Sequence, residues 1–276
     1  MPGTLFVVAT PLGNLEDLSP RAARILAEAD LIACEDTRRT RKLLNYFSIQ
    51  TPSTSYHEHN ERSKTSKLIA LLRQGKQIAL VSDAGTPLLS DPGYRLVHAC
   101  REEKIPVHPV PGPSAAITAL SVSGLPTDRF FFVGFLSRRA ALQGRQLQEI
   151  SQLDSTLLLY LSPHGLLPTL RRILEVLGNR RVFLIREMTK VHESHYFGRL
   201  QEILKALEKE TPRGEYTLVI EGLSGHKKSS SELDAAAYVT GLMKLRGLTQ
   251  KEAIKAASQE LGIPKREIYK KMTNVE

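Results

Sequence analysis

The stretch from Val81 to Gly93 combines residue types that suit a ligand-binding loop. It reads Val-Ser-Asp-Ala-Gly-Thr-Pro-Leu-Leu-Ser-Asp-Pro-Gly. Glycine adopts backbone conformations that are closed to other residues, and proline fixes φ and removes a hydrogen-bond donor. Asp83, Thr86 and Ser90 carry the polar groups that such a loop would direct at a ligand. Two consecutive turns in a surface crossover would have a similar composition, so this stretch alone leaves both interpretations open.

Three stretches of this kind each follow an apolar run that predicts a strand. They are Thr10–Asn14, Asp83–Pro87 and Pro111–Ala115. Open α/β sheets bind ligands at the carboxyl ends of their strands, so we interpret all three as candidate ligand loops. The sequence has no Gly-x-Gly-x-x-Gly after its first strand, no Walker loop, no Gly-x-Ser-x-Gly and no His-Glu-x-x-His. These absences disfavour a dinucleotide as the ligand.

Histidines and cysteines do not predict a metal centre. His57 and His59 are two residues apart, and no third ligand follows at a standard spacing, so a substrate contact or a loop hydrogen bond suits them better. The two cysteines, Cys34 and Cys100, support neither a disulfide framework nor a zinc site. We expect both to be buried thiols in a reducing cytoplasm, and no metal to be bound.

Charge and length constrain the class of protein. The chain of 276 residues has 38 Lys and Arg against 29 Asp and Glu, a net charge of +9. Such an excess favours polyanionic partners, and the length favours two or three units. No apolar run approaches the roughly 20 residues of a membrane span. The apolar patch Leu5–Ala9 is too short for a signal peptide and lacks a basic flank, so it predicts a first strand.

The elements that would position the three loops alternate between strand and helix. Strands are predicted at Leu5–Ala9, Leu31–Cys34 and Ile78–Ser82 and from Val107 on, and a helix begins at Ser19-Pro20. This alternation predicts a parallel sheet in an N-terminal α/β domain at 1–125. Further strands and helices predict a second α/β domain at 126–224, and a polar, serine-rich linker follows at 225–232.

The last residues, 233–276, predict a small all-helical module. Thr249 and Glu252 fit a capping box, and the helix that they open would bury Ile254, Ala257 and Leu261. Short helices joined by tight turns resemble a helix-turn-helix module, which binds nucleic acid. A helical cap or an oligomerisation element is the alternative that the pattern leaves open.

The three loops resemble those of the tetrapyrrole methylase superfamily. The resemblance extends to Cys34-Glu35-Asp36-Thr37-Arg38, Ser123-Gly124-Leu125-Pro126 and Arg186-Glu187-Met188-Thr189-Lys190, and covers nearly the whole chain. Within the superfamily the chain is similar to the small-subunit (16S) ribosomal RNA cytidine 2′-O-methyltransferases, which share the helical tail. The sequence departs from the family pattern at Ser137–Arg139, at Leu161, where glutamate is usual, and at Gly165, where arginine is usual.

The resemblance implies two α/β domains with a cleft between them that holds S-adenosylmethionine, usually in a homodimer. The product would be S-adenosylhomocysteine, and the acceptor would be ribosomal RNA or the small ribosomal subunit. The cofactor-binding residues that it implies are Pro11, Asp83, Gly85, Thr86, Leu88, Ser114, Ala115, Leu161, Ser162 and Thr217.

A ribose hydroxyl is a weak nucleophile at neutral pH, so a group that accepts its proton would help the reaction. Glu35, Asp36 and His57 are candidates because each lies just beyond an early strand or in the loop that bears His57. An acidic pair beside Arg38 and Arg39 would serve equally well as a structural ion pair.

Two basic clusters are candidates for RNA contact. They are Arg38, Arg39, Arg41 and Lys42 after the second strand, and Lys265, Arg266, Lys270 and Lys271 in the tail. Two alternatives remain open. A porphyrinoid methyltransferase would not need the basic tail, and a non-catalytic nucleic-acid-binding protein would leave the three ligand loops without a purpose.

Overall fold

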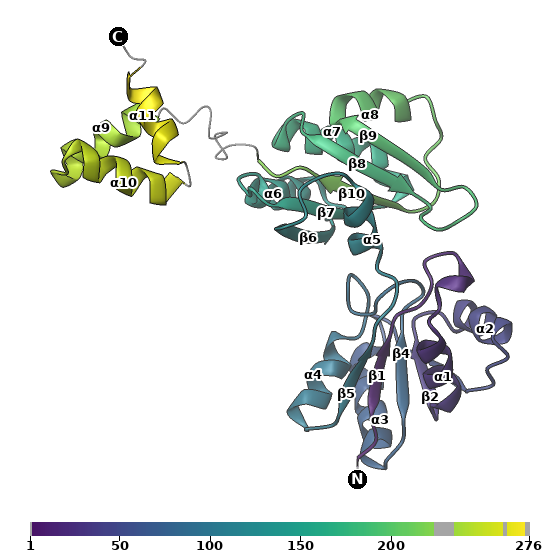
Figure 1. The fold of residues 1–276 in the computed structure, drawn as a ribbon. Helices are drawn as coiled ribbons and strands as arrows, with labels where there is room; N and C mark the ends of the chain where they lie inside the picture. Colours follow the sequence, from purple (N-terminus) through teal and green to yellow (C-terminus); the bar gives the residue numbers. More distant parts are fainter. Residues whose placement is uncertain (1, 224–234, 262–263, 274–276) are drawn as a thin grey trace. The chain divides into compact units, whose positions relative to one another are not determined.

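The computed structural model describes residues 2–223, 235–261 and 264–273. It consists of two compact units, one from Met1 to Leu223 and one from Ser224 to Glu276 (Figure 1). The first unit contains two five-stranded sheets. In the described ranges, no helix combines the length and apolarity that crossing a membrane requires.

The first sheet is entirely parallel, as the strand–helix alternation predicts. Its strands, in the order β3-β2-β4-β1-β5, are β1 (Leu5–Val8), β2 (Leu31–Cys34), β3 (Ser53–Ser55), β4 (Ile78–Val81) and β5 (Val107–Val110). The sequence does not predict the short edge strand β3, because Ser-Thr-Ser has no apolar pattern.

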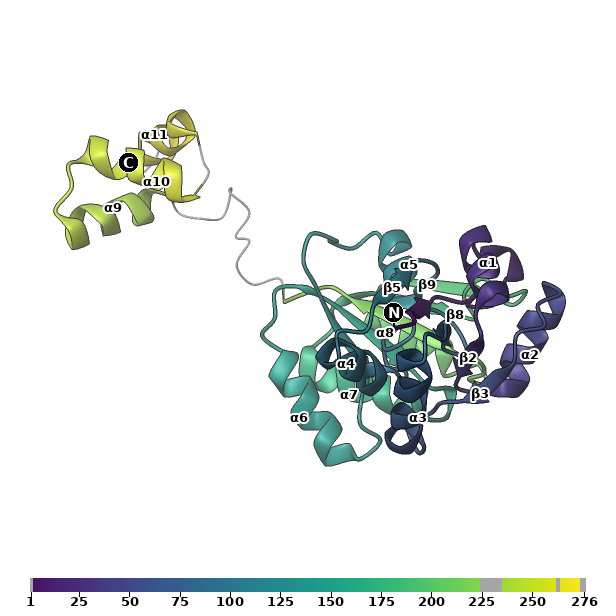
Figure 2. The same cartoon turned by 90° about the horizontal axis from the view of Figure 1, so that it is seen from below.

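Helices cover both faces of this sheet (Figures 1 and 2). They are α1 (Pro20–Glu28) and α2 (Thr37–Tyr46) on one face, and α3 (Glu61–Arg73) and α4 (Tyr94–Glu102) on the other. The predicted start of α1 is confirmed: the Ser19 Oγ accepts a hydrogen bond from the Ala22 N–H at 3.1 Å, and Pro20 follows the cap. Cys34 and Cys100 are free and buried.

The second sheet is mixed, in the order β6-β7-β10-β8-β9. Its strands are β6 (Phe130–Phe135), β7 (Thr156–Leu161), β8 (Arg181–Arg186), β9 (Ser194–Arg199) and β10 (Tyr216–Ile220). Only β6 and β7 are parallel, and β10 runs antiparallel between β7 and β8. The sequence does not predict the edge strand β9, because Ser-His-Tyr-Phe-Gly-Arg lacks a clear apolar alternation.

The faces of the second sheet are covered by different segments. On one face lie α6 (Ala140–Ile150), α7 (Leu166–Leu177) and α8 (Leu200–Leu207). On the other lies α5 (Ala115–Val122), whose Ala116, Ala119 and Leu120 pack with Leu158 and Val219 of the sheet. The chain therefore reaches the second sheet already at α5, before the residue 125 at which the sequence places the domain boundary.

The second unit is a bundle of α9 (Ala235–Arg246), α10 (Gln250–Leu261) and α11 (Lys265–Thr273). Val239, Leu242, Ile254, Ala257 and Ile268 are at its centre. At the start of α10, Glu252 accepts hydrogen bonds from both the backbone N–H and the hydroxyl of Thr249. The predicted linker 225–232 lies outside the described residues, as do the ends of the predicted module 233–276 and the side chain of Leu261.

Candidate functional site

The three candidate loops meet at the carboxyl edge of the first sheet. Thr10 and Gly85 exchange two backbone hydrogen bonds, of 2.9 and 3.0 Å. The Thr86 hydroxyl donates to the Pro113 carbonyl at 3.0 Å. The neighbouring strands β1 and β4 continue into α1 and α4, which lie on opposite faces of the sheet. This divergence is the switch point at which open α/β sheets bind ligands.

The loop after β4 holds several residues in the left-handed backbone region. Gly85 has a φ of 80° and Gly93 a φ of 140°, as their glycine identity predicts. Leu88 and Ser90 also have positive φ, of 75° and 68°, although side chains disfavour that region. Strained backbone of this kind clusters at functional sites, where the surrounding packing maintains it.

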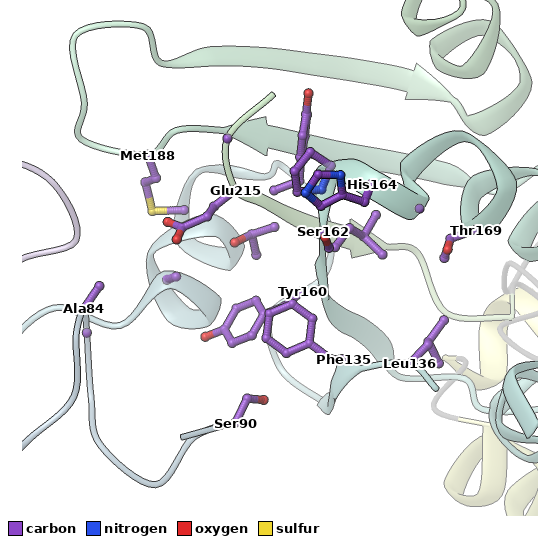
Figure 3. Close-up of a pocket in the computed structure, with 18 of the residues that line it drawn as sticks. Ala84, Ser90, Phe135, Leu136, Tyr160, Ser162, His164, Thr169, Met188 and Glu215 are labelled. Carbon is purple, nitrogen blue, oxygen red and sulfur yellow. The ribbon is translucent and has the colours of Figure 1, made fainter. Parts of the chain in front are cut away.

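These loops form one wall of a cavity of about 1260 Å³, and the second sheet forms the other wall. Figure 3 shows Tyr160 and Phe135 of the second sheet in the middle of the cavity, with Ser90 of the first wall near their rings. Pockets that bind a single drug-sized ligand measure roughly 300–1,000 Å³, so this cavity is larger than one such ligand requires.

Eight of the ten predicted cofactor-binding residues line the cavity. They are Asp83, Gly85, Thr86, Ser114, Ala115, Leu161, Ser162 and Thr217. Pro11 and Leu88 do not line it: Pro11 is buried, and Leu88 packs against the core of the first sheet. The two departures from the family pattern, Leu161 and Gly165, both line the cavity.

One cavity-lining hydroxyl has its oxygen buried without a partner. The Ser114 Oγ makes no hydrogen bond within the described part of the chain, although Ser114 immediately precedes α5. A buried polar atom that lacks a partner is costly, so it suits contact with a polar ligand group. Ser114 lies next to Pro113, whose carbonyl accepts the Thr86 hydrogen bond, so the wall around it is held in place.

Three carboxyl groups of the cavity wall titrate above their ordinary range. Burial raises the pKa of Asp91 to about 7, and the neighbouring Glu35 and Asp83 carboxylates add to the effect. Burial also raises the pKa of Glu35 and of Asp83. In the described residues neither Glu35 nor Asp91 forms an ion pair, whereas Asp83 pairs with Arg39 at 3.3 Å. Asp91 is therefore suited to gain or lose a proton near neutral pH, and the pKa of Glu35 is shifted in the same direction.

The other two predicted catalytic residues lie outside the cavity lining. Asp36 caps α2: its carboxylate accepts hydrogen bonds from the Arg38 side chain and backbone, which lower its pKa. The His57 Nε2 hydrogen-bonds with the Asn60 side chain at 3.1 Å, and the backbone N–H of His57 donates to that amide at 2.9 Å. The His57 Nδ1 is buried and has no partner among the described residues.

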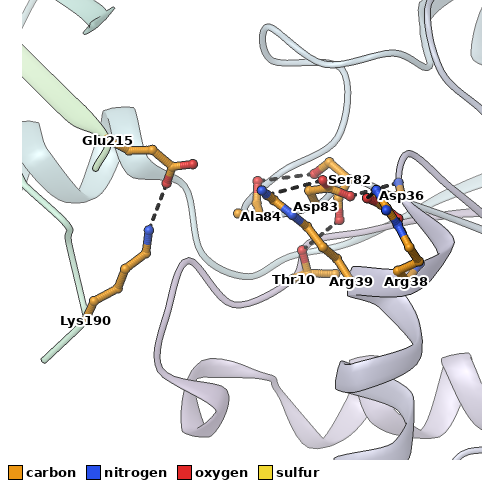
Figure 4. Close-up of polar contacts among 9 residues, drawn as sticks. All are labelled: Thr10, Asp36, Arg38, Arg39, Ser82, Asp83, Ala84, Lys190 and Glu215. Atoms are coloured by element: carbon orange, nitrogen blue, oxygen red, sulfur yellow. Dashed lines mark hydrogen bonds and ion pairs between the residues drawn. The ribbon is translucent and has the colours of Figure 1, made fainter. Parts of the chain in front are cut away.

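The basic residues of α2 divide between the cavity and the surface. Arg39 lines the cavity and pairs with Asp83, which also accepts the Asp36 N–H at 2.9 Å (Figure 4). Arg38, Arg41 and Lys42 are exposed and do not line it. In α11, Lys265, Arg266 and Lys270 are exposed, and the side chain of Lys271 lies outside the described residues.

A second ion-pair cluster closes the cavity wall on the side of the second sheet. Lys190 Nζ lies 3.0 Å from Glu215 (Figure 4) and also 3.0 Å from Glu187. Figure 4 draws only the pair with Glu215. Burial alone would lower the pKa of Lys190, but the two carboxylates outweigh it and raise the pKa. The segment also contacts the first loop, because Thr189 Oγ1 accepts the Asn14 N–H at 3.2 Å.

Sequence reasoning does not single out several lining residues, among them Asp91, Tyr160 and Lys190. Asp91 lies inside the Val81–Gly93 stretch, and Lys190 lies in a stretch that carries the family resemblance. Both signals are present, but only the fold shows which side chains of those stretches face the cavity. In the part of the chain that the structure describes, no three His, Cys, Asp or Glu side chains gather as a metal site.

Comparison with known proteins agrees with this geometry. The family model of the Tetrapyrrole (Corrin/Porphyrin) Methylases matches residues 4–204. The protein named Ribosomal RNA small subunit methyltransferase I from Halalkalibacterium halodurans is 48% identical over 272 residues, which cover 97% of this chain and 93% of that protein. The protein of the same name from Synechocystis is 46% identical over 269 residues, with 97% and 96% covered.

Solved structures share the fold of the first unit. Diphthine synthase superimposes with a TM-score of 0.65 at 15% identity, covering 84% of this chain and 94% of that one. The uroporphyrin-III C-methyltransferase of Thermus thermophilus, solved in complex with S-adenosylhomocysteine, gives a TM-score of 0.56 at 17% identity, covering 79% and 97%. By its sequence relatives and its fold, the chain belongs to the tetrapyrrole methylase family and, within it, to the ribosomal RNA small subunit methyltransferases I.

Proposed function

We propose that this protein transfers a methyl group from S-adenosylmethionine to small-subunit ribosomal RNA, at the ribose 2′-hydroxyl of a cytidine. The observation that carries the proposal is the 48% identity, over 97% of the chain, to a relative named for methylating that RNA. The cavity between the two sheets supports the proposal, because residues of the three candidate ligand loops line it. The cytidine and its 2′-hydroxyl rest on the family resemblance alone.

The cavity residues fit the methyl donor. Polar contacts to its amino-acid end come from the Ser114 Oγ, which has no partner among the described residues, from the backbone around Gly85 and from the half-buried Asp83. Leu161 and Ala115 offer apolar surface to its adenine. When bound, S-adenosylmethionine supplies an activated methyl group on a sulfonium. The task of the protein is to hold the donor and the ribose so that oxygen, carbon and sulfur align, which supplies much of the acceleration.

The proton of the ribose hydroxyl needs an acceptor, and we assign this role to a carboxylate of the cavity wall. The sequence predicts Glu35, and Asp91 joins it because its pKa is raised to about 7 by burial and by neighbouring carboxylates. A general base is most effective when its pKa lies near the working pH. Asp36 and His57 do not line the cavity, and Asp36 already caps α2.

The substrate also requires cationic surface outside the cavity. Arg38, Arg41 and Lys42 of α2 are exposed beside Arg39, which lines the cavity, so α2 offers phosphate contacts close to the site. We assign the same role to Lys265, Arg266, Lys270 and Lys271 of the helical module. We place the protein in the cytoplasm, where its ribosomal substrate lies, and we propose a homodimer because the family resemblance implies one.

The position of the methyl group tests the proposal directly. The protein is incubated with labelled S-adenosylmethionine and with unmethylated small subunits, and the RNA is then hydrolysed with alkali. A methyl on the 2′-oxygen blocks cleavage at the adjacent phosphate, so we expect the label in an alkali-resistant dinucleotide that begins with cytidine. Label in mononucleotides would contradict the ribose assignment. Transfer to a porphyrinoid but not to RNA would favour the alternative that the solved structures of the family suggest.

A further inference from the structure

The Phe135 side chain is exposed at the cavity, where a core phenylalanine would be buried. It is 56% exposed and lines both the large cavity and an adjoining one of about 590 Å³. Its ring centroid lies 5.4 Å from that of Tyr160 at a tilt of 58° (Figure 3). The ring centroid of Tyr160 lies in turn 5.3 Å from that of Phe132. Phe135 thus leans on an aromatic cluster while much of its own surface remains open.

A β-bulge determines where Phe135 points. In a regular strand, Phe135 would share a face with Phe131 and not with Phe132. The register against β7 shifts between Phe132 and Gly134, so that Phe132 pairs with Leu158 but Phe135 pairs with Tyr160. Paired residues of parallel strands share a face, so the shift turns Phe135 to the face of Phe132 and the cavity. Bulges beside functional sites commonly redirect a side chain in this way.

The bulge is held against the loop of the first sheet. Gly134 has a φ of 69°, and a Cβ atom at this position would come within 2.6 Å of the Ser90 Oγ. Ser90 itself has a positive φ and lines the cavity. The Ser90 side chain therefore packs against the Gly134 backbone, and this contact fixes the position of Phe135 relative to the predicted donor loops.

Cationic groups without carboxylate partners lie in the same wall. Arg138 and Arg172 line the cavity, and neither forms an ion pair with any described residue. Arg172 Nη1 donates to the Ala140 carbonyl at 2.7 Å, which orients its guanidinium. The other lining cations, Arg39 and Lys190, are already paired with carboxylates. Guanidinium groups that no carboxylate neutralises are suited to bind phosphate.

We infer that Phe135 is the stacking platform for the base of an unstacked nucleotide that enters the cavity, with Arg138 and Arg172 receiving its flanking phosphates. The inference rests on the proposed function. A 2′-hydroxyl can reach a donor inside the cavity only if its nucleotide leaves the RNA helix, and proteins hold such nucleotides by stacking the base on an aromatic ring. The substrate class is therefore a looped-out or flipped nucleotide within RNA. The alternative is that the adenine of the donor, and not a base of the RNA, stacks on Phe135.

Kinetics of Phe135→Leu against Phe197→Leu test the inference. Phe197 is also 56% exposed, on the edge strand β9, and does not line the cavity. With unmethylated small subunits as substrate, we expect kcat/KM for RNA to fall about tenfold or more in Phe135→Leu, the loss expected for one base–aromatic stack. Phe197→Leu should match the parent, Phe135→Tyr should recover most of the rate, and the Kd for S-adenosylhomocysteine by calorimetry should not change in any variant.

A crosslink locates the base independently. Ribosomal RNA that contains 5-iodocytidine should crosslink on irradiation to the tryptic peptide 130–138 at Phe135, and Phe135→Leu should abolish the crosslink. Equal kcat/KM in Phe135→Leu and Phe197→Leu would overturn the inference while methylation by the parent leaves the proposed function standing. Weaker binding of S-adenosylhomocysteine to Phe135→Leu would overturn the inference, because it would show that Phe135 contacts the donor. A parent inactive on RNA would remove the proposed function, and the inference with it.

Discussion

Asp91 differs from the surface carboxylates of this chain in its surroundings rather than in its chemistry. Its carboxyl group faces the cavity together with Glu35 and Asp83, and burial followed by repulsion from Glu35 raises its pKa from 3.8 to about 7. Asp36, in the neighbouring loop, has its pKa lowered because Arg38 donates hydrogen bonds to it. The two aspartates thus differ in pKa because of their surroundings: burial raises that of Asp91, and hydrogen bonds lower that of the helix cap Asp36.

We predict that Asp91→Asn makes the protein more stable at pH 8 and less active. Between about pH 4 and pH 7 the folded state keeps a proton that the unfolded state has released, so the free energy of unfolding of the parent should fall as pH rises through this range and then level off. The amide of the variant does not titrate, so the variant is spared this loss. Thermal unfolding should show a higher Tm than the parent at pH 8 and an equal Tm at pH 4.

The same variant should lose kcat, by about a hundredfold or more if Asp91 accepts the proton. The parent kcat should rise with pH up to about 7, because the ionised carboxylate is the active form. Glu35→Gln is the matched comparison. If Asp91→Asn keeps the parent kcat and Glu35→Gln loses it, the acceptor is Glu35.

At the scale of elements, the site depends on how β1, β4 and β5 end. The paired backbone of Thr10 and Gly85 joins the first two loops, and Thr86 joins the second to the third. Gly85 contributes through its φ of 80° and through close approach, since a Cβ there would lie 3.1 Å from the Leu12 side chain. A β-branched side chain at such a φ is strongly disfavoured.

Gly85→Val should therefore abolish S-adenosylmethionine binding and leave a cooperative thermal transition. The matched control is Gly178→Val, because Gly178 also has a φ of 80° but no described atom lies within 4 Å of its added Cβ, and it does not line the cavity. Calorimetry on both variants separates donor-loop damage from general backbone strain. Donor binding at parental affinity in Gly85→Val would show that the donor site lies elsewhere.

At the scale of the whole molecule, the net charge of +9 is spread over two compact units. The first unit contains the cavity and the basic residues of α2, and the second offers Lys265, Arg266 and Lys270 on its surface. RNA affinity should therefore fall steeply with salt, with a log–log slope that reflects the phosphates contacted by both units.

Removal of residues 232–276 should make that slope shallower by about two to three, if each of the three exposed cations of α11 neutralises one phosphate. Donor affinity should not change, because every described residue that lines the cavity lies in the first unit. The measurement is RNA binding by filter retention across a salt series, with calorimetry for the donor. An unchanged slope would favour the interpretation of the helical module as a cap.

Many features of the fold could be predicted from the sequence, because they depend on the conformational preferences of neighbouring residues. Ser19 before Pro20 predicts the start of α1, and glycine at positions 85 and 93 predicts loops with positive φ, because these preferences belong to the residues themselves. Parallel strands place their carboxyl ends at one edge, so the gathering of the three loops also followed from the sequence. The motifs of those loops suggested the family, and the family model that matches residues 4–204 confirmed it.

Two features of the site, the pKa of Asp91 and the orientation of Phe135, were decided only by the tertiary structure, because they depend on atoms from distant segments. The raised pKa of Asp91 requires Glu35, 56 positions away, and burial of its carboxyl group by the packed fold. Phe135 faces the cavity because a bulge beside it packs against Ser90 and reverses the alternation of its strand. Desolvation of Asp91 arises only in the packed fold, and the register of Phe135 is set only where β6 pairs with β7, so neither can be assigned from the sequence around the residue alone.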